Sequence, residues 1–368
     1  MNVAKKLSEY VAGRDNNYNL IRFIAAALVL YSHSYPLTKN VEPLNALLGV
    51  TWGSMAVSVF FISSGFLVMA SLWNKNNLLA FAWARILRIY PALIVAVLFC
   101  VAVVGWYFTT YNTADYFSDP VTLKYIKRNI TLFNSVKYDL PGVFANNPYP
   151  SAVNGSLWTL PYEIKMYTYL AVICTLLIYV QKKLNLSIFK GSLLLMTLIS
   201  LAANISSQFS LVEHDYKLHF FSIFFTGASF YIFREKIVLS SRIFWGLLLV
   251  LSVSTYSQPV FQVLYLLILP YLIFYLAYVP AGKIRAFNRF GDYSYGLYIY
   301  AFPVQQSIAA LMPEVSVWMM TTLAFVMSLV LSYLSWHLVE KRALALKDSY
   351  VVIEQFFSKL KGSKSTSS

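Results

Sequence analysis

About ten apolar runs divide this chain, and they constrain its fold more than any other feature. The runs cover residues 18–37, 50–73, 84–108, 157–180, 190–207, 218–233, 241–256, 258–279, 293–312 and 316–338. A helix needs about 20 mostly apolar residues to cross a bilayer, and most of the runs are close to that length. A backbone in lipid must also satisfy its own hydrogen bonds, which a helix does within one segment. The sequence therefore predicts an all-α polytopic membrane protein, a bundle of about ten transmembrane helices.

The distribution of charge agrees with this fold class. Only 12% of the residues are charged, whereas soluble domains average about 25%. The net charge of +14 does not indicate a nucleic-acid partner, because most lysines and arginines fall in segments that share one side of the membrane. Basic residues favour the cytoplasmic side. We therefore expect an even number of helices and both termini in the cytoplasm.

The chain is expected to form one membrane domain over residues 1–342, followed by a basic cytoplasmic tail, 343–368, that is disordered. The longest polar segment of the domain, 109–156, is predicted to lie on the outer side. Loops of this length are usually functional or disordered, and an aromatic residue such as Tyr149 could stack on a sugar. No cysteine–histidine spacing resembles a metal site and no glycine-rich phosphate loop is present. The sequence thus predicts no metal and no tightly bound cofactor.

Two ionisable residues, Arg22 and His33, interrupt the first apolar run. A helix advances about 100° per residue, so both side chains lie on one face, about 16 Å apart along the axis. Ionisable groups inside a membrane mark a site or a pathway, and histidine suits proton transfer near neutral pH. The alternatives are that His33 is a satisfied polar group at a helix contact and that Arg22 snorkels to the cytoplasmic rim.

Arg85 and Arg88 lie at the cytoplasmic mouth of the third run, three residues apart and so on one helix face. A guanidinium is a planar fork that matches phosphate. This pair, together with Arg22, could hold a ligand that carries phosphate. The alternative is ordinary anchoring of basic residues on the cytoplasmic side.

Glu163 stands at the outer start of the fourth run and needs a partner there. Lys165 is one candidate, and His33 is another if the two helices are neighbours. A carboxylate bonded to one ring nitrogen would fix the tautomer of the histidine and stabilise its charged form during base catalysis. The alternative is a local ion pair or a charge favoured by the helix dipole.

The ordered set of these residues resembles the acyltransferase-3 family, polytopic membrane acyltransferases that modify cell-surface glycans. Arg22 and His33 match its signature of arginine, ten residues and histidine. The other matching segments are FFISSGFLV at 60–68, RILRIYP at 85–91, SLWTLPYEIKMY at 156–167, GDYSYGLYIYAFPVQ at 291–305 and LVEK at 338–341. Ala301 stands where many relatives carry histidine. The fused esterase-like domain of many relatives has no counterpart in these residues, so we expect the reaction to be completed within the membrane domain.

The resemblance implies a multi-pass O-acyltransferase of the bacterial cytoplasmic (inner) membrane, surrounded by lipid. It would move an acetyl group from cytoplasmic acyl-CoA, with acetyl-CoA as co-substrate, to a saccharide that is often lipid-linked. His33 would be the general base, Glu163 would orient it, and Arg22, Arg85 and Arg88 would bind the phosphates of the donor.

Two other functions would also fit a bundle with buried ionisable residues. One is a proton-coupled exporter of a glycan or small solute, although no internal repeat is evident. The other is a non-catalytic membrane scaffold, which would leave the cost of burying His33 and Glu163 unexplained.

Overall fold

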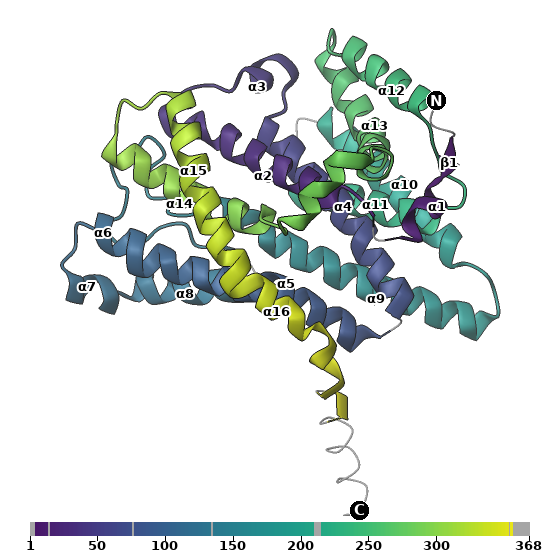
Figure 1. The fold of residues 1–368 in the computed structure, drawn as a ribbon, viewed down its shortest axis with the longest axis horizontal. Coiled ribbons are helices and arrows are strands. Elements are labelled where there is room, and N and C mark those ends of the chain that lie inside the picture. Colours follow the sequence, from purple (N-terminus) through teal and green to yellow (C-terminus); the bar gives the residue numbers. More distant parts are fainter. Residues whose placement is uncertain are drawn as a thin grey trace, which may run out of the picture.

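The computed structural model describes residues 4–13, 15–75, 77–133, 135–209, 215–352 and 354–355. Its longer helices are α2 (Tyr18–Ser34), α4 (Trp52–Lys75), α5 (Leu78–Phe99), α9 (Leu160–Leu184), α10 (Phe189–Gln208), α11 (Tyr216–Ile232), α12 (Ser241–Ser254), α13 (Gln258–Tyr278), α14 (Ser294–Leu311) and α15 (Val317–Ser335). The shorter helical elements are α1 (Leu7–Val11), η1 (Pro36–Thr38), α3 (Pro43–Leu48), η2 (Cys100–Gly105), α6 (Trp106–Phe108), α7 (Thr113–Ser118), α8 (Pro120–Thr131), η3 (Gly155–Thr159), η4 (Gly282–Arg289), η5 (Trp336–Glu340), α16 (Lys341–Ala345) and η6 (Leu346–Ser349). Within the described ranges the strands are β1 (Lys5–Lys6) and β2 (Val238–Leu239), which pair antiparallel. The architecture is therefore a helical bundle, as the apolar runs predict (Figure 1).

Each of the ten apolar runs contains a long helix. Among the described residues, seven helical segments are long and apolar enough to cross a membrane. They are Tyr18–Thr38, Trp52–Lys75, Leu78–Phe108, Gly155–Leu184, Phe189–Ser207, Gln258–Tyr278 and Val317–Val352. Helices α11, α12 and α14 lie outside this set. The structure is thus that of a polytopic protein, while the number of ten crossings and the side on which the termini lie remain predictions.

Helix α4 packs tightly against α11 in the interior of the bundle. A Cβ atom added to Gly65 would collide with the carbonyl oxygen of Phe224, and one added to Gly227 would collide with that of Ile62. The two glycines let the helix backbones touch, as small residues do between membrane helices. Helix α2 packs against both α4 and α14. This arrangement places the predicted site residues of α2 among neighbouring helices.

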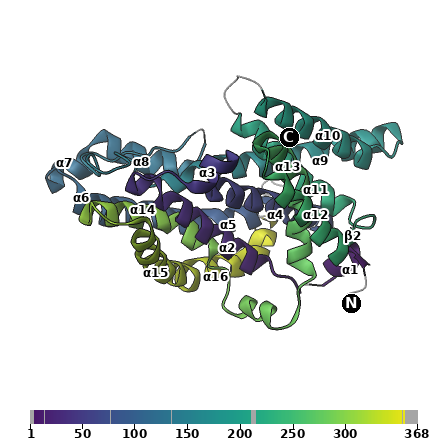
Figure 2. The ribbon, with the colours of Figure 1, turned by 90° about the horizontal axis from the view of Figure 1, so that it is seen from above.

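The polar segment 109–156 does not stay on the surface over its whole length. Its helices α7 and α8 gather with α6 at one end of the molecule (Figure 2). The chain then returns into the bundle, where Ser156 is fully buried. Gln306 of α14 holds this return, because its Nε2 donates to the carbonyl oxygens of Tyr149 and Ala152, each at 2.7 Å. The end of the segment is therefore part of the packed interior.

The first part of the expected tail is helical and packs against α5. Elements α16 and η6 follow directly on η5, and Nε1 of Trp83 donates to the carbonyl oxygen of Leu346 at 3.0 Å. The predicted disorder therefore does not apply to residues 343–349. The end of the tail, 356–368, lies outside the described residues.

Candidate functional site

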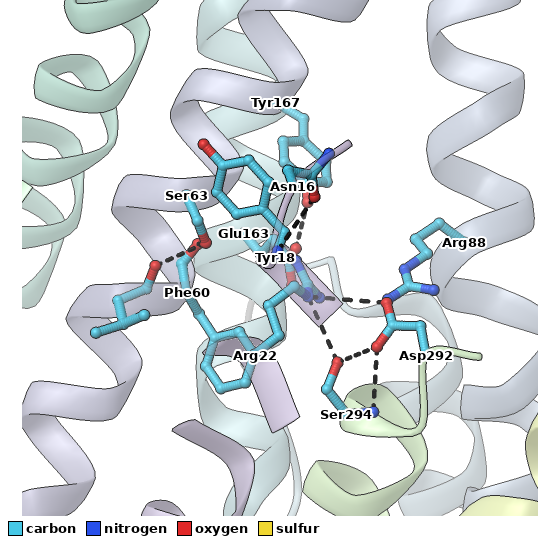
Figure 3. A network of polar contacts seen from close by, with 11 residues as sticks. Asn16, Tyr18, Arg22, Phe60, Ser63, Arg88, Glu163, Tyr167, Asp292 and Ser294 are labelled. Atoms are coloured by element: carbon cyan, nitrogen blue, oxygen red, sulfur yellow. Dashed lines mark hydrogen bonds and ion pairs between the residues drawn. The ribbon is translucent and has the colours of Figure 1, made fainter. Parts of the chain in front are cut away.

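Three residues that are far apart in sequence form an ionic cluster in the interior, which we call the Asp292 cluster: Arg22 of α2, Arg88 of α5 and Asp292 just before α14. Nε of Arg22 lies 3.9 Å from Oδ2 of Asp292, and Arg88 forms an ion pair and hydrogen bond with the same oxygen. The other carboxylate oxygen accepts from the backbone N–H of Ser294 at 3.2 Å and from its hydroxyl. Figure 3 shows both arginines pointing at the carboxylate.

The charges of this cluster are largely shielded from solvent. The side chains of Arg22, Arg88 and Asp292 are 15%, 18% and 13% exposed. Burial raises the pKa of Asp292, but the guanidiniums of Arg88 and Arg22 and the hydrogen bonds from Ser294 outweigh burial and hold that pKa at about 2. Asp292 is therefore ionised at neutral pH, and the three residues together carry one net positive charge.

Sequence reasoning missed Asp292. The residue lies in the block GDYSYG that supports the family resemblance. An acidic residue directly before an apolar run indicates a charged group near a membrane helix, and this signal could have identified it as a candidate. Its two partners lie in other helices, so no local spacing connects them. The pairing changes the interpretation of Arg22 and Arg88, because both already have a carboxylate partner.

Glu163 of α9 lines a small cavity together with Arg22. The cavity has a volume of about 40 Å³, and Ser294 and Tyr298 of α14 also line it. A space of this size has room for a few water molecules but not for a substrate. Glu163 accepts a hydrogen bond from the hydroxyl of Tyr167, one helical turn further on.

Neither expected partner of Glu163 bonds to it within the described part of the chain. The ammonium of Lys165 lies instead over the ring of Tyr162, 5.4 Å from its centroid. His33 forms no hydrogen bond or ion pair with the carboxylate among the described residues either, and its ring meets that of Phe302 instead. The expectation that Glu163 orients His33 is therefore not met in this structure.

His33 lies in the last turn of α2, the helix that also carries Arg22. Its ring meets the ring of Phe302 of α14 edge to face, with centroids 5.2 Å apart and planes at 84°. Nδ1 of His33 is buried and has no hydrogen-bond partner among the described residues. No group thus fixes the tautomer through this nitrogen, and the imidazole can take up a proton without breaking a hydrogen bond at Nδ1.

Two contacts join the chain before α9 to α14 between the cavity and His33, and we call them the α14 seam. The hydroxyls of Thr159 and Tyr298 form a hydrogen bond of 2.7 Å. One turn towards His33, a Cβ atom added to Gly155 would lie 2.7 Å from two ring atoms of Phe302. Arg22 and Glu163 thus line the cavity together with Thr159 and Tyr298, whereas His33 contacts Phe302, one turn further along α14.

Arg85 faces a different and larger space, between α5 and α9. This groove has a volume of about 380 Å³ and is lined mostly by apolar side chains, together with Tyr167. The guanidinium lies 5.7 Å from the centroid of the Tyr167 ring, and its Nε is buried without a hydrogen-bond partner in the described ranges. No described carboxylate forms an ion pair with Arg85, so of the three predicted phosphate-binding arginines it is the most available to an anion.

Glu340 in η5 is a further buried acid close to the Asp292 cluster. It is 2% exposed, and its charge interacts with that of Arg88. One oxygen accepts from the hydroxyl of Ser335 at 2.8 Å, while Oε2 has no partner among the described residues. Sequence reasoning noted this glutamate only as part of the segment LVEK and gave it no role.

Comparison with known proteins gives matches over nearly the whole chain. A family described as an acyltransferase domain matches residues 15–337. An O-acetyl transferase from Shigella phage Sf6 is 31% identical over 338 residues, which cover 90% of this chain and 96% of that protein. Nodulation protein 10 of Rhizobium leguminosarum bv. viciae is 25% identical over 386 aligned residues, with 94% and 97% of the two chains covered. No solved structure gives a significant match. This chain belongs to the acyltransferase family and is an acyl-transferring enzyme.

Proposed function

We propose that this enzyme moves an acetyl group from acyl-CoA at the cytoplasmic face to a hydroxyl of a saccharide at the outer face. The observation that carries the proposal is that one helix, α2, holds both the residue proposed for the donor phosphates, Arg22, and the proposed base, His33. Arg22 belongs to a cluster with net positive charge, and His33, about 16 Å further along the axis, has a ring nitrogen without a hydrogen bond. The O-acetyl transferase of phage Sf6, similar over 90% of the chain, supports the choice of acetyl and oxygen.

In the proposed reaction His33 acts as the general base. The imidazole takes the proton of the sugar hydroxyl while the hydroxyl oxygen attacks the thioester carbonyl carbon. The carbon–sulfur bond breaks, and the proton on His33 passes to the thiolate of CoA. The apolar surroundings of the ring, with Phe302 against it, exclude water that would otherwise hydrolyse the thioester.

Arg85, Arg88 and Arg22 are proposed to attract and hold the phosphates of acyl-CoA, which enters as a diffusible co-substrate. Arg85 is the first contact in this proposal, since its guanidinium has no carboxylate partner within the described residues. Arg22 and Arg88 add the single net charge that remains after pairing with Asp292. Phosphate oxygens suit the fork of a guanidinium.

Glu163 takes a different role from the one expected from the sequence. It lies on the inner side of the α14 seam, beside Arg22. In our proposal its carboxylate accepts from the amide N–H groups of the pantetheine arm as that arm passes towards His33. The seam must open for this passage, because the cavity of about 40 Å³ is much smaller than the roughly 300–1,000 Å³ of ligand pockets.

The test uses inside-out vesicles from the bacterial cytoplasmic membrane, where we propose that the enzyme resides. The vesicles receive acetyl-CoA labelled in the acetyl group and the lipid-linked saccharides of the source cells. We expect label in the saccharide fraction with the wild type and none with His33→Ala, while acyl-CoA binding is retained. Equal labelling by the variant would remove His33 from the mechanism. No label and no acyl-CoA binding with the wild type would overturn the function and favour the exporter.

A further inference from the structure

The rings of His33, Phe302 and Tyr149 form a row of contacts that ends at the surface of the molecule. The ring of His33 contacts Phe302 at 5.2 Å between centroids, and Phe302 contacts Tyr149 at 6.0 Å, each pair edge to face at 84°. Phe302 is 4% exposed, whereas Tyr149 is 46% exposed. Tyr149 is thus the solvent-facing end of a packed row of rings that begins at the proposed base.

Hydrogen bonds to Gln306 of α14 hold the segment that carries Tyr149 in place. The buried amide of Gln306, 0% exposed, donates to the backbone oxygen of Tyr149 itself. Asn147 in turn donates to the side-chain oxygen of Gln306 at 2.7 Å and to its backbone oxygen at 2.9 Å. The ring of Tyr149 is therefore presented on a preformed support, and little conformational freedom remains to be lost when a ligand binds.

We propose that Tyr149 stacks on the acceptor saccharide and positions its hydroxyl for His33. A sugar ring has an apolar face of C–H groups that suits the face of an aromatic ring, and tyrosine combines such a face with a polar end. The rings of Tyr149 and His33 lie at most about 11 Å apart across Phe302, so a saccharide that stacks on Tyr149 has to extend past Phe302 to bring a hydroxyl to the imidazole. This inference rests on the proposed function, because it names the acceptor-binding residue of the same site.

Tyr111 provides a matched control on the same outer segment. It is 47% exposed, nearly the same fraction as Tyr149, but its ring makes no contact with Phe302 among the described residues. An effect of removing an exposed tyrosine from the membrane surface should be shared by both positions. An effect on acceptor binding should appear only at Tyr149.

The experiment measures transfer of labelled acetyl as a function of the concentration of lipid-linked saccharide from the source cells, in the full-length protein. For Tyr149→Ala we expect the half-saturating saccharide concentration to rise roughly three- to tenfold, as for the loss of one aromatic contact. The half-saturating acyl-CoA concentration should stay within about twofold of the wild type. Tyr149→Trp and Tyr111→Ala should both behave like the wild type.

Each outcome separates this inference from the proposed function. Transfer by the wild type with an unchanged saccharide concentration dependence in Tyr149→Ala overturns the role of Tyr149 and leaves the function intact. A rise in both half-saturating concentrations, or equal losses in Tyr149→Ala and Tyr111→Ala, shows a structural role and also overturns it. Failure of the wild type to label any saccharide would overturn the proposed function itself, and this inference with it.

Discussion

The Asp292 cluster gives the most direct test of how the interior of this protein is held together. Asp292→Asn keeps the size of the side chain and an oxygen for the hydrogen bonds of Ser294, but it removes the negative charge. Arg22 and Arg88 would then lose the carboxylate that they share, at side-chain exposures of 15% and 18%. The substitution therefore isolates the charge from the shape of the residue.

The expected cost follows from the geometry. Two unit charges about 4 Å apart, as for Arg22 and Asp292 at 3.9 Å, attract by about 4 kcal/mol at an effective dielectric constant of about 20. Arg88 lies closer to the same oxygen. Removing one partner of a buried pair costs about 3–5 kcal/mol, because the remaining charge stays buried without compensation. We expect Asp292→Asn to lower the free energy of unfolding by this amount.

The assay is unfolding of the purified protein in mixed micelles of mild detergent and SDS, followed by circular dichroism. Asp348→Asn is the matched control, since Asp348 lies 3.8 Å from Lys75 but is 72% exposed. Exposed pairs contribute about 0–1 kcal/mol, so this variant should unfold almost like the wild type. A double-mutant cycle with Arg88→Met should give a coupling energy above about 1 kcal/mol, because the two residues are in contact.

The reasoning fails if Asp292→Asn and Asp348→Asn lose the same stability, within about 0.5 kcal/mol. It also fails if the cycle between Asp292 and Arg88 gives no coupling. Either result would mean that the interior is wet enough to screen the cluster, and Arg22 and Arg88 would then be free to bind an external anion.

Three further predictions concern the seam, the groove and pH. Gly155→Ala should lower transfer at least tenfold, because the new methyl group would displace Phe302; transfer by Gly246→Ala, where nothing lies within 4 Å, should be unchanged in the same labelling assay. Arg85→Gln should weaken acyl-CoA binding in equilibrium dialysis about tenfold while stability is retained, since no described carboxylate loses its partner. The stabilisation by Asp292 should be complete above about pH 4, the usual pKa of an aspartate, and should disappear as the pH falls to about 2. The difference in unfolding free energy between wild type and Asp292→Asn should thus be constant from pH 5 to 8 and shrink below about pH 4, and a difference that changes with pH above 5 would contradict this assignment.

The sequence predicts the helices well and their partners poorly, for physical reasons. Lipid forces each long apolar run to be helical, and the period of the helix alone places Arg22 and His33 on one face of α2. Contacts between helices depend on how the helices pack side by side. The spacing of residues within one helix does not determine this packing. Asp292 could therefore not be paired with Arg22 and Arg88 from the sequence.

Glu163 and the segment around Ser156 show two other limits. Tyr167, the partner of Glu163, is four residues away, a spacing that the sequence does display. Sequence reasoning favours a charged partner for a carboxylate in an apolar helix, and a tyrosine hydroxyl gives no such signal. Ser156 ends the polar segment 109–156, which the sequence predicts to lie on the outer side of the membrane. Ser156 is fully buried, and the chain just before it is bonded to Gln306, about 150 residues further along the sequence.

The α14 seam also bears on the energy supply of the cell. A protein with titratable groups on a line between the two faces of a membrane offers protons and ions a path down their electrochemical gradients. The hydrogen bond between Thr159 and Tyr298 and the close approach of Gly155 to Phe302 lie along α14 between the cavity beside Arg22 and the ring that meets His33. Packed side chains at this point hinder the passage of protons between the two groups, and so help to preserve the proton-motive force of a membrane that holds the enzyme.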